Sequence, residues 1–166
     1  PKKIISRLDK VIKFELQRDT DEVNRDGMEI GICVIDLDTL KMEYAGAGIP
    51  LRLMKHGSEE LTIYKSPRQM VGGIEGDEQE VHAQLTKETI QLDVKDRILL
   101  SSDGFQDQFG GEFDKKFMSK NFNRLIESSS VHPIEEQKKV IEKTFKEWSK
   151  NTSQTDDVCV LGFEVK

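Results

Sequence analysis

Three aspartates stand where apolar segments of the sequence meet polar turns. Asp103 follows the run RILLSS, and Asp156 and Asp157 come just before the run VCVLGFEV. If these runs form neighbouring antiparallel strands, the end of one and the start of the other lie at the same rim of the sheet, and the aspartates come within reach of a common ion. Carboxylate oxygens without histidine or cysteine suit Mg²⁺ or Mn²⁺ better than Zn²⁺. The pattern therefore indicates a candidate site for a divalent cation, with Gly104 allowing a sharp turn beside it.

The same residues also have a plain structural explanation. Ser-Asp-Gly is a common turn sequence, and acidic residues at the start of a strand form an ordinary polar edge. Residue spacing alone does not decide between a turn and a metal site, so both interpretations stay open at this point.

Histidine and cysteine chemistry finds little support in the sequence. His56, His82 and His132 fall in different expected elements, and none has a serine, cysteine or carboxylate motif beside it. Cys33 and Cys159 lie inside apolar runs without metal-ligand spacing, which predicts reduced, buried thiols and a cytoplasmic setting. We therefore assign no catalytic role to these five residues.

Length and charge limit the class of protein further. The chain has 166 residues, of which 34% are charged, and its formal net charge is -6. This length predicts a single domain spanning residues 1–166, with a core that needs no disulfides. The negative charge argues against a nucleic-acid partner, because contacts with phosphates need a basic face. No apolar run approaches the roughly 20 residues needed to cross a bilayer.

Hydrophobic periodicity predicts the elements that must position the aspartates. The first half reads as one amphipathic helix, then two pairs of strands, then a long polar loop, with these expected ranges: helix 4–17, strands 28–36, 40–47, 51–57 and 59–65, and loop 66–80. The second half reads as strands 81–92 and 97–102, helices 117–129 and 133–150, and a last strand 156–165.

Two finer expectations concern the second half. The last strand is apolar almost throughout, which predicts a place inside a sheet. Phe105, Phe109 and Phe113 recur at a spacing of four, which would suit one helical segment packed on the core. Because hairpin connections dominate over a βαβ rhythm, we expect an α+β sandwich of antiparallel sheets with flanking helices.

Several runs in this order resemble a known family. They are DGMEIGICVIDLDTLKMEYAGAGIPLRLM, DRILLSSDGFQDQFGG, PIEEQKKVIEKTFKEW and QTDDVCVLGFEV. Together they resemble the C-terminal two-thirds of a SpoIIE-like protein phosphatase domain, a bacterial branch of the metal-dependent, type-2C serine/threonine phosphatases. The resemblance implies an αββα sandwich and a centre of two Mn²⁺ or Mg²⁺ ions, at which water attacks the phosphate ester. Asp103 and Asp156 would be metal ligands, Asp157 would occupy a position beside them that is often asparagine in relatives, and Gly104 would be the turn glycine.

The sequence also departs from the family pattern. The family domain normally begins with a Gly-Asp-(Phe/Tyr) strand and an Asp-x-x-Gly-His-Gly segment, which supply the aspartate that bridges both metals, and the chain contains neither. The loop AGAGIPL also lacks the asparagines of the family's AGANNPL-like loop. We therefore expect an N-terminally truncated domain without the family's first strands and helix, holding at most one metal weakly, with weak activity or none.

The resemblance implies a function in bacterial signalling. The complete domain would hydrolyse phosphoserine or phosphothreonine on a phosphorylated regulatory protein of the anti-anti-sigma type, under the control of sensor or receiver domains upstream. The alternative is a non-catalytic regulatory or protein-binding module with the phosphatase fold, and a weaker third interpretation is an unrelated metal-assisted hydrolase. A cytoplasmic location fits both main hypotheses and is compatible with a membrane-anchored longer protein.

Overall fold

The computed structural model describes residues 1–17, 27–68, 70–72 and 85–166. The chain forms two compact units, which are described separately: unit 1 contains Pro1–Leu51 and Tyr64–Leu92, and unit 2 contains Arg52–Ile63 and Asp93–Lys166. His82 and most of the expected loop 66–80 lie outside the described residues.

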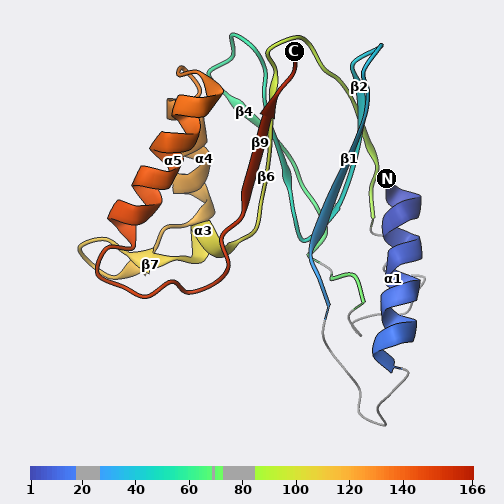
Figure 1. Cartoon of the computed structure of the whole chain (residues 1–166), viewed down its shortest axis with the longest axis horizontal. Helices are drawn as coiled ribbons and strands as arrows, with labels where there is room; N and C mark the ends of the chain where they lie inside the picture. The colour runs from blue at the N-terminus through green and yellow to red at the C-terminus, as the bar shows by residue number, and fades with distance from the viewer. Residues whose placement is uncertain (18–26, 69, 73–84) are drawn as a thin grey trace. The chain divides into compact units, whose positions relative to one another are not determined.

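In its described residues, unit 1 combines helix α1 with a three-stranded antiparallel sheet (Figure 1). Its elements are α1 (Lys2–Gln17), β1 (Ile30–Asp36), β2 (Lys41–Ala47) and β5 (Glu88–Gln91), with the strand order β1-β2-β5. The predicted hairpin of β1 and β2 is confirmed, and its turn is closed by the carboxylate of Asp36, which accepts hydrogen bonds of 3.0 Å from the N–H groups of Asp38 and Thr39.

The predicted amphipathic helix is confirmed, and its apolar stripe covers part of this sheet. Ile5 is fully buried in a cluster with the small side chains of Ala45 and Ala47 on β2, and Leu8 and Ile12 pack against the same cluster. Burying such a stripe stabilises a helix far more than its intrinsic propensity does.

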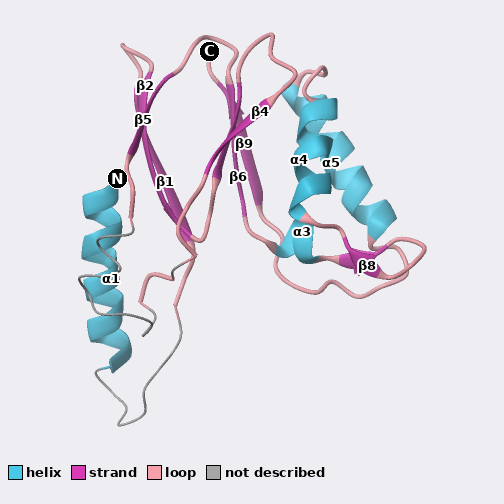
Figure 2. Ribbon diagram, turned by 180° about the vertical axis from the view of Figure 1, so that it is seen from behind, coloured by secondary structure: helices cyan, strands magenta, loops and turns pink. Residues whose placement is uncertain are grey.

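Unit 2 contains most of a four-stranded sheet, three helices and a short hairpin (Figure 2). The sheet order is β4-β3-β6-β9, from β3 (Leu51–Met54), β4 (Leu61–Tyr64), β6 (Arg97–Ser101) and β9 (Val160–Glu164). The other elements are α3 (Gly104–Asp107), β7 (Phe109–Gly110), β8 (Lys115–Lys116), α4 (Ser119–Ser129) and α5 (Ile134–Trp148). Helices α4 and α5 lie side by side against the sheet. The expected mixture of helices and antiparallel sheets is confirmed.

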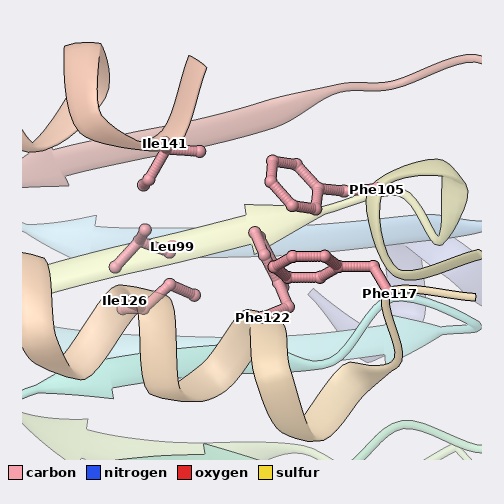
Figure 3. Packing of buried hydrophobic residues seen from close by; sticks show 6 residues of the cluster. All are labelled: Leu99, Phe105, Phe117, Phe122, Ile126 and Ile141. Carbon is pink, nitrogen blue, oxygen red and sulfur yellow. The ribbon is translucent and has the colours of Figure 1, made fainter. Parts of the chain in front are cut away.

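The core of unit 2 holds the short helix α3 in place. Phe105 of α3 is 2% exposed, and its ring centroid lies 4.6 Å from that of Phe122 on α4 and 5.1 Å from that of Phe117 (Figure 3). Such offset and edge-on aromatic contacts add to the burial of apolar area. Because α3 begins directly after Asp103, the aromatic core also fixes the turn that carries this aspartate.

Two predictions about the last strand were wrong. Among the described strands, β9 lies at the edge of its sheet and pairs only with β6, and Leu161 is 57% exposed. Both cysteines were expected to be buried, but Cys159, just before β9, is exposed. Cys33, on β1, is only partly buried. A continuous apolar run indicates apolar surroundings for a strand but does not determine its position in the sheet order.

The prediction of one helical segment carrying three phenylalanines was also wrong. Helix α3 ends at Asp107, and the chain turns into the β7–β8 hairpin, where Phe113 is 73% exposed. The pair Gly110–Gly111 allows this turn, since Gly111 has a φ of 70°. Only Phe105 keeps the expected place in the core.

In the part of the chain that the structure describes, no helix is both long enough and apolar enough to span a membrane.

A buried carboxylate joins two loops of unit 2. Asp96, 1% exposed, accepts hydrogen bonds from Lys55 Nζ at 2.7 Å and from the backbone N–H groups of His56 and Asp93, each at 2.9 Å. Burial raises the pKa of this carboxyl, but the hydrogen bonds and the charge of Lys55 outweigh it, so the pKa of Asp96 lies below its ordinary value.

Replacing Asp96 with asparagine keeps the shape of the side chain and removes its charge. We expect the free energy of unfolding at neutral pH to fall by about 1–3 kcal/mol, because hydrogen bonds to a charged group are lost. The contribution of Asp96 is complete above its unfolded pKa of about 3.9 and is lost as the pH falls through the lower folded pKa. Urea unfolding across this acidic range should therefore show a smaller loss of stability for Asp96→Asn than for the wild type.

The matched control is Asp93→Asn, which removes a 72% exposed carboxylate from the same lysine and should cost less than about 1 kcal/mol. Equal acid sensitivity of Asp96→Asn and the wild type would contradict the role given to Asp96.

Candidate metal centre

The antiparallel pairing of β6 with β9 brings the two aspartate segments to one end of unit 2. Ser101 at the end of β6 pairs with Val160 at the start of β9. One residue further, the N–H of Ser102 donates to the C=O of Cys159 at 3.0 Å. The strands next to Asp103 and Asp156 are therefore antiparallel neighbours. The prediction of a common rim for these aspartates required this pairing.

The side chain of Ser102 fastens the two segments to each other. Its hydroxyl donates to the C=O of Asp157 at 2.9 Å and accepts from the N–H of Cys159 at 2.9 Å. This hydroxyl therefore fixes the backbone of Asp157 against the residue that directly precedes Asp103.

Gly104 completes the close approach from the other side of Asp103. It is buried, and a Cβ at this position would lie 2.3 Å from the carbonyl oxygen of Asp157 and 2.9 Å from its carbonyl carbon. No side chain fits at these distances, so a glycine is required here for steric reasons. Gly104, predicted as a turn residue, therefore also leaves room for the backbone of Asp157.

The three carboxylates differ in their surroundings. Asp103 is half-buried at the N-cap of α3, where its side chain makes no capping hydrogen bond. Asp156 and Asp157 are exposed, and one carboxylate oxygen of Asp156 accepts the N–H of Asp157 at 2.7 Å. A cation bound by Asp103 and by the second oxygen of Asp156 stays a prediction.

These groups fit a hard divalent cation in part. The donors are carboxylate oxygens, which Mg²⁺ and Mn²⁺ prefer, and they come from two segments that are locked together. Within the described ranges, however, no three acidic, histidine or cysteine side chains gather closely enough to hold a metal ion. The described residues therefore supply a fraction of a ligand set.

Two cavities of unit 2 are lined by residues other than these aspartates. A cavity of about 510 Å³ between α5 and the strands β6 and β9 is lined by apolar side chains such as Phe105, Ile141 and Val160. A second cavity, of about 620 Å³, is lined in part by His56 and His132. None of the three aspartates lines either cavity, and Asp156 and Asp157 are exposed, so the candidate centre lies on an open rim.

Sequence reasoning missed two polar residues that shape this rim. Ser102 and Gln108 both stand in the polar stretch after β6, where serine and glutamine look like ordinary turn and surface residues. Their roles depend on contacts with residues more than 40 positions away in the chain, with separations of 55 for Ser102 and 47 for Gln108. No local pattern carries that information.

The chain matches a known protein family over its full length. The family model described as stage II sporulation protein E matches residues 1–166, which is the whole chain. The chain belongs to the SpoIIE family. No relative was found among curated protein sequences.

Solved structures agree with the SpoIIE assignment. The SiaA-PP2C domain of Pseudomonas aeruginosa aligns with a TM-score of 0.75 at 23% identity, covering 98% of this chain and 70% of that domain. The manganese-presoaked phosphatase domain of SpoIIE from Bacillus subtilis aligns with a TM-score of 0.60 at 17% identity, covering 99% and 66%. The serine/threonine phosphatase of S. agalactiae aligns with a TM-score of 0.61 at 14% identity, covering 98% and 68%.

These similarities establish the fold of the chain as that of PP2C-type phosphatases. The SpoIIE family and its structural neighbours are serine/threonine phosphatases, and the chain spans about two thirds of the length of each of these three neighbours. The expected family is therefore confirmed, and the individual ligand assignments remain predictions.

The contact between Gly104 and Asp157 generates a direct test. Gly104→Ala would place a methyl group 2.3 Å from a backbone oxygen that Ser102 holds in position. We expect the free energy of unfolding, measured with urea, to fall by about 1–3 kcal/mol, as for other overpacked sites.

Gly162→Ala in β9 is the matched control, because its nearest neighbours would lie 3.6 Å from the new methyl group, an ordinary contact distance. Its effect should stay within about 0.5 kcal/mol. Equal stabilities of the two variants would show that the close approach at Gly104 has been misjudged.

Proposed function

We propose that the domain of which this chain is a part hydrolyses phosphoserine or phosphothreonine on a phosphorylated regulatory protein of bacterial signalling, of the anti-anti-sigma type. Membership of the SpoIIE family and the PP2C-type fold support the reaction class. The observation that carries the proposal is the fastening of the Asp103 turn to the Asp156–Asp157 segment by Ser102 and Gly104.

Within this proposal, Asp103 and Asp156 are ligands of Mn²⁺ or Mg²⁺, and Asp157 stands beside them. A divalent cation bound there would supply a water of lowered pKa and would offset the negative charge of the phosphoryl group. The chain's own contribution is to hold its carboxylates at a fixed separation through two backbone segments. Two ions are proposed for the complete domain, and the described residues account for only part of their ligands.

The shape of the rim favours a protein substrate over a small molecule. Small ligands are usually bound in concave pockets that bury most of their surface. Asp156 and Asp157 are exposed, and neither of the two cavities described above includes them. An open rim of this kind admits a phosphorylated side chain that projects from the surface of a folded partner.

The proposal extends to the setting of the domain. We place it in the cytoplasm, under the control of sensor or receiver domains in the full-length protein, since a phosphatase for regulatory proteins needs an input that governs its activity. For the 166-residue chain by itself we expect weak binding of one Mn²⁺ and little turnover, because the affinity of such sites depends on the number of charged ligands.

A second candidate function is a non-catalytic regulatory or protein-binding module with the phosphatase fold. The observation in its favour is that the described residues bring no three potential ligands together. The two candidates differ in whether Asp103 matters for chemistry.

Asp103→Asn provides the test between them. In the protein that contains this domain, Mn²⁺ should stimulate phosphate release from a phosphoserine protein. The substitution should lower kcat/KM by at least about 100-fold, because even the loss of a residue that only orients a metal ligand lowers activity 10–100-fold. The chain by itself should show a parallel loss of Mn²⁺ binding in titration calorimetry.

Asp114→Asn is the matched control, since it removes the same charge from an exposed position in the β7–β8 turn whose φ of 47° asparagine tolerates well. Activity that survives Asp103→Asn unchanged would exclude the proposed ligand. Absence of Mn²⁺-dependent phosphate release from the protein containing the domain would favour the non-catalytic module.

A further inference from the structure

The amide side chain of Gln108 is the most completely buried polar group near the candidate centre. Gln108 lies between α3 and β7 and has an exposed fraction of 0%. A buried amide is expensive unless both its donors and its acceptor are used, so a residue of this kind has a structural reason to be where it is.

Both ends of this amide are bound to the loop that precedes Asp156. The Nε2 group donates to the C=O of Ser153 at 2.9 Å and contacts Thr152 Oγ1 at 3.3 Å, while Oε1 accepts the N–H of Thr155 at 3.0 Å. Nε2 also donates to the C=O of Phe109 at 2.9 Å. The reverse orientation of the amide would point its oxygen at two carbonyl groups, so the donor and acceptor assignment is determined by the partners.

The backbone of Gln108 is itself held firmly. Its C=O accepts the indole N–H of Trp148 at 3.0 Å and the backbone N–H of Phe117 at 3.0 Å. Trp148 and Phe117 are in edge-on ring contact, with centroids 5.2 Å apart, and pack on the core of unit 2. Two hydrogen bonds therefore hold the backbone of Gln108 against the core of unit 2.

The position of Gln108 in the chain connects the two ligand segments. It follows Asp103 by five residues, across the single short helix α3, and it binds Thr155, the residue directly before Asp156. We propose that Gln108 is a positioning residue for the candidate metal centre: its amide sets the path of residues 152–155 and thereby the place of the Asp156 carboxylate relative to Asp103. This inference rests on the proposed function, because it takes these aspartates to be the ligands.

Only a glutamine meets the demands of this position. A glutamate would accept from the N–H of Thr155 but would turn negative oxygens toward the carbonyls of Phe109 and Ser153. A methionine of similar length would fill the space, but the C=O of Ser153 and the N–H of Thr155 would lose their partner on this side chain. The C=O of Phe109 would keep the hydroxyl of Thr152, which donates to it at 2.7 Å.

The first experiment compares Gln108→Met with Gln137→Met by calorimetric titration with MnCl₂, at a temperature where both variants are folded. Gln137 is the matched control because it is also a buried amide, 3% exposed, that donates to the main chain, at the C=O of Ile126, but it joins α5 to α4 and contacts neither aspartate segment. We expect Gln108→Met to lower the affinity for Mn²⁺ by about 10–100-fold, as for other residues that orient metal ligands. Gln137→Met should change it less than twofold while lowering thermal stability similarly, a split that general destabilisation would not produce.

The second experiment needs no variant and no metal. Amide hydrogen exchange of the wild-type chain should show the N–H of Thr155 protected to a degree close to that of Ser102, because both donate to partners in the fold. Exchange of the Thr155 amide as fast as that of exposed Asn151 would overturn the anchoring role, whether or not Gln108→Met folds.

The outcomes separate this inference from the proposed function. If Asp103→Asn weakens Mn²⁺ binding and Gln108→Met does not, the positioning role is wrong and the metal centre stands. If Asp103→Asn has no effect on binding, the metal centre and the role of Gln108 toward it both fall.

Discussion

The candidate centre depends on the antiparallel pairing of β6 with β9 and on the hydrogen bonds of Ser102 that extend it by one residue. These bonds reach Asp157 and Cys159 and place the last residue before Asp103 against the segment that carries the other two carboxylates. A one-residue shift in the register would move every side chain of β9 to the opposite face of the sheet. The chemistry proposed for the rim is therefore set by backbone geometry, and Gly104 contributes by having no side chain in the way.

The pairing is supported by the packing behind it. Helix α3 has four residues, too few to be stable by itself. It is held because Phe105 is buried against the rings of Phe122 on α4 and of Phe117 just before α4. The C=O of Gln108, the residue that follows α3, also accepts the indole N–H of Trp148 at the end of α5. The aromatic core thus supports both ligand segments. It holds the turn of Asp103 through α3 and the segment of Asp156 through the loop after α5.

Much of the fold follows from local patterns, and the details of the site do not. The apolar stripe of α1, the hairpin of β1 and β2, and the aspartates at the ends of β6 and β9 are visible in the sequence because each depends on near neighbours. The edge position of β9, the exposure of Cys159 and the exposed Phe113 were mispredicted because strand order and burial depend on which distant segments cover a residue. Gln108 was overlooked for the same reason, since three of the four partners of its amide, Thr152, Ser153 and Thr155, lie far along the chain.

Paramagnetic relaxation by Mn²⁺ tests most directly whether the two carboxylate segments form one site. In amide-resolved NMR spectra of the chain, small additions of Mn²⁺ should broaden the signals around Asp103 and those around Asp156 together and at the same concentration, because both would lie beside one ion. The signals of Asp114, which carries an exposed carboxylate in the β7–β8 turn, should keep their widths at that concentration. Broadening of only one of the two segments, or of exposed acidic residues throughout the chain, would contradict a shared metal centre.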